Sequence, residues 1–593
     1  MQRVARFTFR HLYPRRGVAR SNGGLATALV VCALFLAGCS AGNNEPTTVA
    51  ITQPDPTPYE NVSPRPEQDP NVQTPPPDEE VAEPPTEATV PTPVPSPNPA
   101  SPGPLVPVPT LPPAAAQIVP RDPLPIADAA RVGAWGKLAN WPVIPIHVSV
   151  LPDGRVMTYG TDPFGKQGAK FHYDVWDPAA GIGADSHLTL SNTTGTDIFC
   201  SAQLVLPLTG ELLMNGGDLW NTAGTGTTNT PVKDVTIFDP ASNTMSSAGQ
   251  MNRPRWYASA TTLPTGEMYL QGGSGGNDRA EVRSEDGSFR LLTGFVTNDL
   301  GASYPRNFVG PDGKIFGMSY TKMYRIDPYA NDGEGSRKDL GTITGYAPDW
   351  TSAAVMFEPG RILQVGGRDN KAAIIDINGS TPIVTSAGTL TQVRSWVNAT
   401  VLADGKVAIT GGSAVNNTTT QVAYQVELFD PVTKSWMVGP EATRMRLYHS
   451  TSVLLPDATL FTGGGGAPSP QTNLNAEIYY PPYLFKPDGT LATRPTITAA
   501  PTVVETASDF ILVSPDAASI QRITMVATGS TTHSFDMNQR FVEPTFYRNG
   551  DQLVVNMPTN AYETPPGYYM VFAINSAGTP SVSRMVRVNV KQD

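Results

Sequence analysis

The sequence predicts an all-β protein in which a seven-bladed β-propeller is followed by a small β-sandwich. Three observations support this prediction. Gly and Pro are abundant (54 and 59 of 593 residues) and charged residues make up only 16%, so turns must be frequent and strands short. One motif recurs seven times over residues 128–490. Short strand-like runs without that period fill residues 491–593.

The recurring motif consists of an opening residue, a short run, a turn with Pro, Asp or Gly, and a β-run that often ends in Gly-Gly. Spacings of 46 to 57 residues together with the Gly-Gly pair are typical of kelch repeats, in which each copy forms one four-stranded blade. Equivalent loops of all blades face the same end of the propeller axis, so we expect the opening residues to converge there. The seven copies open at His147, Cys200, Tyr257, Tyr304, Trp350, Val397 and Tyr448.

The segment after the repeats contains short β-runs separated by polar turns. This pattern over residues 491–593 favours an immunoglobulin-like sandwich. The runs are Phe510–Val513, Arg522–Val526, Leu553–Met557, Tyr568–Ile574 and Met585–Val590.

The first 39 residues have the composition of an export signal. Six arginines precede the apolar run Leu25–Leu36, which is too short for a comfortable transmembrane helix and ends in small residues. The sequence Leu36-Ala37-Gly38-Cys39 resembles a bacterial lipobox, in which the cysteine is lipidated and becomes the new N-terminus. We therefore expect an exported protein, lipid-anchored through Cys39 to the bacterial cell envelope, at the outer membrane or cell surface. The alternative is an ordinary secretory signal in which the cysteine occurs by chance.

Residues 40–127 are expected to form a disordered stalk. Of the 59 prolines, 26 lie between Glu45 and Pro125, among Thr, Glu, Asp and Val with almost no aromatic residues. Such a segment cannot bury enough apolar surface to offset its conformational entropy, and it stays extended. After a lipidated cysteine it would hold the folded body away from a membrane.

Several functions are disfavoured by the composition and the motifs. The net charge of −11 and the lack of a basic cluster in the folded part argue against nucleic acid as a partner. The motifs of zinc proteases, disulfide oxidoreductases, α/β-hydrolases and P-loop proteins do not occur. If the export signal is processed and Cys39 lipidated, Cys200 is the one thiol left in the folded part.

The residues that remain as chemical candidates share one position in the repeat. Cys200, Tyr257 and Tyr448 with its neighbour His449 lie at that position, and His533 is a loop histidine of the C-terminal segment. Imidazole and phenolate groups suit Cu(II). Each residue alone also has a structural explanation, as a small buried hydrophobe, a packing aromatic or a loop histidine. Two tryptophans, Trp350 and Trp396, lie at or beside the same position.

These motifs resemble those of the galactose oxidase and glyoxal oxidase family of copper-radical oxidases, from about residue 130 to the end of the chain. The matching segments are Thr196–Cys200, Arg255–Tyr257, Arg446–Ser450, Thr531–His533, Leu491–Thr498 and Pro566–Ser581. The resemblance implies Cu(II) bound by Tyr257, Tyr448, His449 and His533. It also implies a thioether between Cys200 and Tyr257, with a radical on that tyrosine.

The resemblance further implies oxidation of a small primary alcohol or aldehyde by O2, with release of hydrogen peroxide. In this reaction the Tyr448 phenolate would take the hydroxyl proton and the Tyr257 radical would take the carbinol hydrogen. Two departures make galactose itself doubtful as substrate: a rough alignment puts Leu300 where galactose oxidase has its sugar-binding arginine, and Arg255-Trp256-Tyr257 is closer to glyoxal oxidase. The tryptophan that stacks on the cross-linked tyrosine is also missing from its usual place after Gly272-Gly273-Ser274, so Trp350 or Trp396 would have to cover that ring.

Two functions of other classes stay open. One is a non-catalytic kelch propeller that acts as a surface-binding lipoprotein, which the loss of a ligand residue would favour, but none of the four is missing. The other is a propeller carbohydrate hydrolase, for which no paired carboxylates stand out at matching blade positions.

Overall fold

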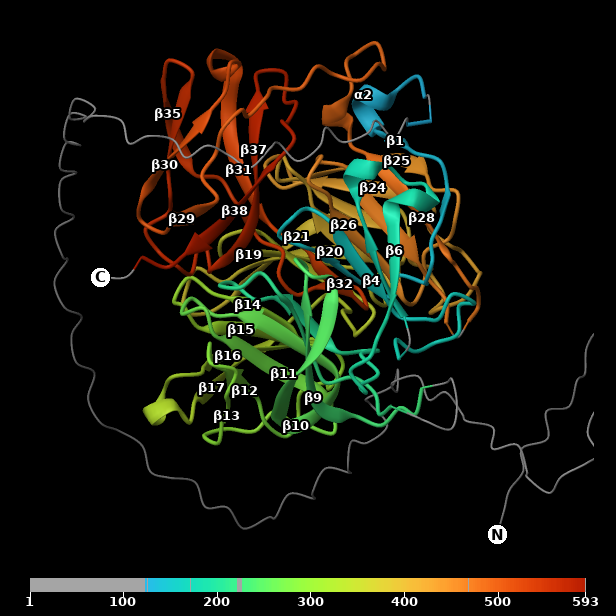
Figure 1. Ribbon diagram of the computed structural model, residues 1–593, viewed down its shortest axis with the longest axis vertical. Coiled ribbons are helices and arrows are strands. Elements are labelled where there is room, and N and C mark those ends of the chain that lie inside the picture. The colour runs from blue at the N-terminus through green and yellow to red at the C-terminus, as the bar shows by residue number, and fades with distance from the viewer. Residues whose placement is uncertain (1–122, 125, 171, 221–226, 468, 592–593) are drawn as a thin grey trace, which may run out of the picture. The chain divides into compact units, whose positions relative to one another are not determined.

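The computed structural model describes residues 123–124, 126–170, 172–220, 227–467 and 469–591, all of which belong to one compact unit (Figure 1). They form a nearly all-β structure, which confirms the predicted fold class. Its helical parts are α2 (Ala129–Val132), η1 (Pro178–Ala180), η2 (Ala184–Ser186), η3 (Asn331–Gly333), η4 (Pro482–Leu484) and η5 (Ala517–Ser519). The export signal, Cys39 and nearly all of the expected stalk lie outside the described residues. In the part of the chain that is described, no helix has the length and hydropathy needed to cross a bilayer.

Antiparallel sheets that follow the repeat make up the propeller. The first repeat forms β3 (His147–Val150), β4 (Val156–Tyr159), β5 (His172–Trp176) and β6 (His187–Ser191). The next two form β7 (Ala202–Val205), β8 (Leu212–Asn215), β9 (Val232–Asp239), β10 (Thr244–Thr262), β11 (Met268–Ser274), β12 (Glu281–Arg283) and β13 (Phe289–Leu291). The fourth forms β14 (Arg306–Val309), β15 (Ile315–Ser319), β16 (Lys322–Asp327) and β17 (Ser336–Thr342).

The remaining repeats continue the pattern. The fifth forms β18 (Ala353–Glu358), β19 (Arg361–Val365), β20 (Lys371–Asp376) and β21 (Ile383–Thr389). The sixth forms β22 (Asn398–Val401), β23 (Val407–Thr410), β24 (Gln425–Asp430) and β25 (Ser435–Glu441). The last forms β26 (Ser450–Leu454), β27 (Leu460–Gly464) and β28 (Asn475–Tyr480).

The second and third repeats are joined by one long strand. The first part of β10 pairs with β9 and its last part pairs with β11, so that both repeats lie in a single seven-stranded sheet. Strand pairing therefore does not separate every copy of the repeat into its own sheet, and the count of seven blades stays a prediction.

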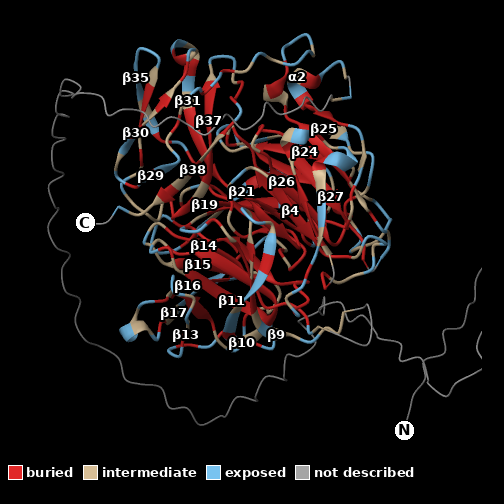
Figure 2. Cartoon of the chain, in the orientation of Figure 1, coloured by how far each residue is buried: buried red, intermediate tan, exposed pale blue. Residues whose placement is uncertain are grey.

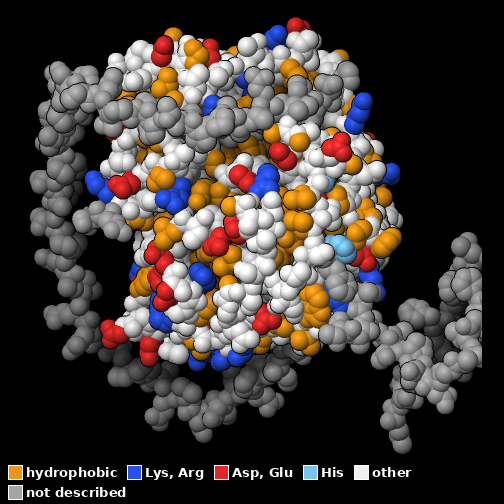
Figure 3. Space-filling view, in the orientation of Figure 1, with side chains coloured by type: hydrophobic (Ala, Val, Ile, Leu, Met, Phe, Trp, Pro, Cys, Tyr) orange, Lys and Arg blue, Asp and Glu red, His pale blue; other side chains and the backbone are white. Residues whose placement is uncertain are grey.

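The last repeat is completed by residues from the start of the described chain. The short strands β1 (Ala134–Trp135) and β2 (Ala139–Asn140) pair with β28, with Ala134 opposite Tyr480 and Ala139 opposite Ala476. The first strand of a repeat is buried along its length, as in β3, whereas the last, such as β6, is largely exposed (Figure 2). Figure 3 shows Lys and Arg side chains lying near Asp and Glu over one face, so that neither sign dominates it.

The C-terminal segment forms two sheets around a core of its own. One sheet contains β29 (Val503–Glu505), β31 (Ile520–Ala527), β34 (Phe541–Val542), β37 (Gly567–Asn575) and β38 (Arg584–Asn589). The other contains β30 (Asp509–Val513), β35 (Thr545–Asn549) and β36 (Gln552–Asn556). The hairpin of β32 (Ser530–Thr532) and β33 (Phe535–Asp536) leaves this domain and extends the sheet of the first repeat, with Thr532 opposite His147. This pairing carries the loop at 533–534 into the propeller.

Three repeats contain a buried ion pair that the sequence analysis did not identify. Each arginine lies two residues before a residue of the shared opening position, and it binds a glutamate from a later strand of its own repeat. The pairs are Arg255–Glu281 (2.8 Å), Arg394–Glu427 (2.6 Å) and Arg446–Glu477 (3.2 Å). Their guanidinium groups also donate to the carbonyl oxygens of Gly272, Gly411 and Gly464.

The Gly-Gly pairs have a matching role between repeats. The amide of Gly217 donates to the carbonyl oxygen of Arg255 in the next repeat (2.9 Å), and a Cβ atom on Gly216 would lie 2.1 Å from that oxygen. Gly412 donates to Arg446 in the same way (2.7 Å). The glycines are required because the backbone of one repeat approaches the arginine of the next too closely for a side chain.

We predict that Glu281→Gln lowers the unfolding free energy by ~3–5 kcal/mol, because it leaves the buried Arg255 guanidinium without its charge partner. The change is measured as a shift of the urea unfolding midpoint. The matched control is Asp278→Asn, which breaks the exposed Arg253–Asp278 pair of the same repeat and should cost at most ~1 kcal/mol. Equal shifts in the two variants would contradict a bracing role for the buried pair.

Candidate metal centre

The residues that meet at the centre share an unusual backbone conformation. A positive φ is uncommon for residues other than glycine and costs energy unless the surrounding structure enforces it. The residues and their φ angles are Cys200 (59°), Tyr257 (73°), Tyr304 (44°), Trp396 (64°), His449 (69°) and His533 (48°). Left-handed backbone thus occurs at six residues of the centre, although not at Tyr448.

Hydrogen bonds from one repeat to the next hold this conformation. The amide of Tyr257 donates to the carbonyl oxygen of Cys200 (2.9 Å), and the amide of Tyr304 donates to that of Tyr257 (2.8 Å). The amide of Trp396 likewise donates to Thr351 (2.9 Å). Tyr257, Tyr304 and Trp396 are therefore each fixed by a residue of the preceding repeat.

Two phenols meet at the centre. The hydroxyl oxygens of Tyr257 and Tyr448 are 2.7 Å apart, and both side chains are buried. Burial is the main cause that raises the pKa of each phenol well above its usual value. Both phenols are therefore neutral at neutral pH unless a cation lies beside them.

Two imidazoles face each other beside the phenols. The Nε2 atoms of His449 and His533 are 2.9 Å apart. The Nδ1 atom of His449 lies 3.0 Å from the carbonyl oxygen of Gly466 and 2.7 Å from that of Ala467, so it carries the proton and leaves a lone pair on Nε2. Burial lowers the pKa of His449 to about 3 and that of His533 well below its usual value. Both rings are therefore neutral, as metal ligands must be.

These four side chains fit a single metal ion of a definite kind. Tyr257, Tyr448, His449 and His533 bring two phenol oxygens and two imidazole nitrogens to one buried location, with the donor atoms of each pair less than 3 Å apart. Imidazole and phenolate are ligands that Cu(II) accepts in tetragonal geometries. The structure thus brings together all four residues that the resemblance implied as ligands.

Cys200 lies at the edge of this group. Its sulfur is 3.8 Å from Nε2 of His533. Burial raises the pKa of the thiol well above its usual value, and a side-chain hydrogen bond with Tyr257 lowers the pKa by a smaller amount. It is the single free cysteine among the described residues, and its sulfur lies beside the phenol to which the resemblance joins it.

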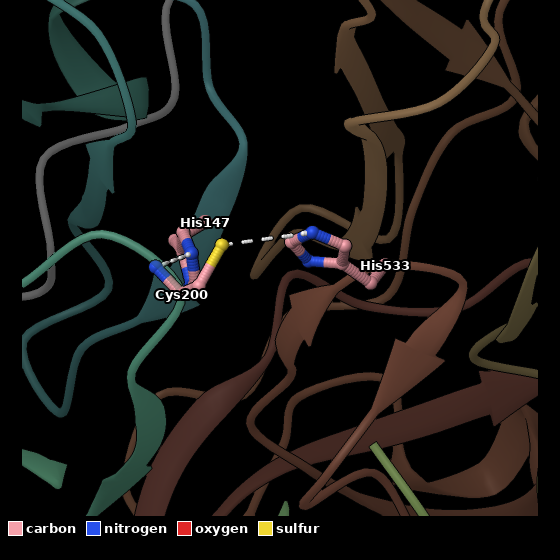
Figure 4. Close-up of side chains that lie close together, drawn as sticks. All are labelled: His147, Cys200 and His533. Carbon is pink, nitrogen blue, oxygen red and sulfur yellow. Dashed lines mark hydrogen bonds between the residues drawn. The ribbon is translucent and has the colours of Figure 1, made fainter. Parts of the chain in front are cut away.

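His147 lies close to Cys200 and was not identified from the sequence as a site residue. Its ring nitrogens, the Cys200 sulfur and the His533 nitrogens approach one another within 4.8 Å (Figure 4). However, Nδ1 of His147 lies 2.7 Å from the Gln203 side-chain oxygen, and Nε2 accepts the amide of Cys200 (3.1 Å). Both nitrogens are engaged, so His147 does not fit as a metal ligand. Its position as the first residue of the first repeat was the signal that could have identified it.

The tryptophans do not lie as the sequence analysis expected. Trp396 packs on Tyr448 (ring centroids 4.3 Å apart), and Trp350 packs edge-on against Trp396 (4.4 Å). The ring beside Tyr257 is instead Trp256, its neighbour in the chain, which is perpendicular to it (4.4 Å, 88°). The expectation that Trp350 or Trp396 covers Tyr257 is therefore corrected, because both rings pack in one cluster with Tyr448 instead.

Tyr304 is a further aromatic residue of the centre, which the repeat placed at this end of the axis but to which the sequence assigned no role at the metal. Its ring stacks on His533 (4.7 Å, 27°) and lies edge-on to Tyr257 (5.2 Å). It thereby fixes the orientation of the imidazole that comes from the C-terminal domain.

Comparisons with known proteins agree with this geometry. The family described as "Galactose oxidase-like, Early set domain" matches residues 494–588. Galactose oxidase of Gibberella zeae is 29% identical over 497 residues, which cover 77% of this chain and 71% of that protein. Aldehyde oxidase GLOX of Vitis pseudoreticulata is 26% identical over 444 residues, covering 66% and 82%. A solved fungal alcohol oxidase in complex with copper superimposes with a TM-score of 0.69 at 25% identity, covering 77% of this chain and all of the other.

These matches support the galactose oxidase and glyoxal oxidase family for this chain. The part of the chain that precedes residue 123 lies outside the described residues, so lipidation of Cys39 stays a prediction.

A buried carboxyl group beside the centre affects its response to pH. Oδ1 of Asp197 accepts the amides of Ala169 (2.8 Å) and Phe199 (3.0 Å), and so it shapes the turn that leads to Cys200. Burial, reinforced by nearby Asp218, raises its pKa to about 7. The folded protein therefore keeps this carboxyl protonated at pH values where the unfolded chain releases the proton.

We predict that the metal-free protein loses stability between pH 6.5 and 4. His147, His449 and His533 stay neutral in the folded state while the unfolded chain takes up protons, and each contributes a slope of up to ~1.4 kcal/mol per pH unit. Asp197 acts in the opposite sense, since its stabilising contribution is lost as the pH rises through about 7. Asp197→Asn should therefore steepen the acid loss.

The measurement is the urea midpoint at several pH values in the presence of a chelator. Asp185→Asn, at an exposed position, is the control and should leave the wild-type slope unchanged. An Asp197→Asn slope equal to that of the wild type would contradict this prediction.

Proposed function

We propose that this protein is a copper-radical oxidase that oxidises a small primary alcohol or aldehyde with O2 and releases hydrogen peroxide. The observation that supports it most is the meeting of the Tyr257–Tyr448 and His449–His533 pairs at one buried location, in a chain whose relatives are named as oxidases. In this proposal Tyr257, Tyr448, His449 and His533 hold the metal. Bound Cu(II) would supply a one-electron acceptor and lower the pKa of the phenols.

The protein side chains would divide the proton and the hydrogen atom of the substrate between them. The Tyr448 oxygen, held as phenolate, would take the hydroxyl proton of the alcohol, or of the hydrate that an aldehyde forms with one water molecule, and burial favours the protonated phenol that results. The Tyr257 radical, joined to Cys200 by a thioether, would take the carbinol hydrogen, and the remaining electron would go to the bound Cu(II). The substrate thus loses two electrons and two protons, and O2 accepts both to form hydrogen peroxide. Because the centre is buried, it orients the substrate carbon and excludes water from these steps.

The proposed substrate is a small aldehyde or a simple primary alcohol rather than galactose. Leu300, which a rough alignment places at the sugar-binding arginine of galactose oxidase, is buried in an apolar cluster. The wall beside Tyr448 consists of the Trp350 and Trp396 rings. Neither feature offers a charged donor to the ring hydroxyls of a sugar.

For its location, we propose export and lipid anchoring through Cys39, with residues 40–127 as the spacer. The support is the lipobox-like sequence and the proline-rich, acidic composition that follows it.

We predict that His533→Ala abolishes tight copper binding and nearly all turnover, because it removes one of four ligands. Copper content by atomic absorption and peroxide release are the measurements. His172→Ala, at a half-buried position on β5, is the control and should retain both. Normal copper content and turnover in His533→Ala would refute the ligand assignment.

We also predict a higher kcat/KM for glyoxal-type aldehydes or simple primary alcohols than for galactose. A peroxide-coupled screen of the copper-loaded protein measures this ratio. A clear preference for galactose would show the substrate proposal to be wrong.

Finally, Cys39→Ala should release the protein from the membrane fraction or leave it unprocessed, because no lipidated N-terminus can form. Fractionation of cells expressing the wild type and the variant tests this. Unchanged membrane association would exclude the anchor.

A further inference from the structure

The amide of Cys200 is bound by a side chain rather than by another backbone group. It donates to Nε2 of His147 (3.1 Å), and Cys200 has the positive φ of 59° that aims its side chain at the centre. A buried amide needs a partner, and the one found here comes from a different repeat. His147 thus links the first strand of the first repeat to the first residue of the second.

His147 is itself fixed from several sides. It is fully buried on β3, between β32 and β4. Its ring stacks on Tyr159 (4.4 Å, 5°), and the Gln203 side-chain oxygen lies 2.7 Å from Nδ1. The Gln203 amide nitrogen donates to the carbonyl oxygens of Val148 (3.1 Å) and Thr531 (3.3 Å), so its oxygen is the atom that faces the imidazole. Nδ1 therefore carries the proton, and Nε2 is an acceptor whose position cannot drift.

The position of the sulfur depends on this acceptor. Cys200 Sγ is directed toward His533 (3.8 Å, Figure 4), and the Tyr257 amide donates to the carbonyl oxygen of Cys200 (2.9 Å), so the two residues are neighbours. If the Cys200 amide lost its partner, the residue could relax out of the left-handed region, which only the surrounding contacts enforce. The sulfur would then turn away from the phenol ring.

We propose that His147 is a positioning residue that holds Cys200 in the conformation required for the thioether bond to Tyr257. This inference rests on the proposed copper-radical function. In the bond-forming step the S–H bond of Cys200 and one ring C–H bond of Tyr257 ortho to the hydroxyl break, and one S–C bond forms. The two electrons and two protons released reduce one O2 to hydrogen peroxide, in the presence of copper.

The test is the rate of this reaction in His147→Phe, which keeps an aromatic ring on Tyr159 but removes the acceptor. Wild type and variant are purified without copper, then exposed to copper and air. Intact mass follows the loss of two hydrogens, and a thiol reagent in denaturant measures the unreacted Cys200. We expect cross-linking to slow by on the order of tenfold, the effect of ~1.4 kcal/mol, while one copper still binds.

Two further variants separate this role from general damage. Gln203→Met removes the oxygen that fixes the His147 tautomer, and it should slow cross-linking by a smaller factor. Tyr173→Phe, in the same repeat, removes only the hydrogen bond of a buried hydroxyl to Asn243 and should react at the wild-type rate. If His147→Phe does not fold, the ratio of the Gln203→Met and Tyr173→Phe rates still decides, and equal rates overturn the inference.

The outcomes also distinguish this inference from the proposed function. A folded His147→Phe protein that cross-links at the wild-type rate overturns the inference alone. Loss of copper binding in that variant overturns it as well, because His147 would then be a ligand. A wild type that never loses two hydrogens overturns the proposed cofactor, and the inference with it.

Discussion

The centre depends on one backbone constraint, the left-handed conformation of several residues at or next to the opening positions of the repeats. A residue with φ near 60° directs its side chain differently from an extended residue at the same position. In Cys200, Tyr257 and His449 this conformation directs the side chain toward the shared location. The conformation is costly alone, and interactions between repeats maintain it. Amides donate to the preceding repeat, and the arginine two residues earlier is held by a buried glutamate and by the carbonyl oxygen of a glycine.

Burial then sets the chemistry of the groups that converge. Phenols and imidazoles removed from water stay neutral, so the four donors approach one another without the repulsion of like charges. The same burial strengthens the attraction between these groups and a metal ion, because water does not screen the charge of the ion there. The site is thus prepared for a metal ion by the fold.

The sequence predicted those parts of this arrangement that follow from the spacing of the repeats. The spacing of the Gly-Gly pairs predicted the propeller and placed Cys200, Tyr257 and Tyr448 at one end of its axis. His533 lies outside the repeats, and only the family resemblance indicated that it joins these residues. The repeat placed His147 and Tyr304 at this end of the axis, but their contacts with Cys200 and His533 were missed. These contacts and the orientation of Trp396 depend on packing between repeats, which the order of residue types does not encode. The buried Arg–Glu pairs were missed for a related reason, since each glutamate lies on a later strand whose register was unknown.

The hairpin of β32 and β33 affects the order in which the parts of the molecule fold. The hairpin inserts beside β3, so that Cys200 contacts His533, which lies 333 positions later in the chain. Likewise, β1 cannot pair until β28 has formed. Loops of this length close at a high entropic cost and therefore late, after the local hairpins of each repeat have formed. The four side chains of the centre can therefore come together only after the C-terminal hairpin has inserted, and the partly folded chain has no assembled set of metal-binding groups before that step.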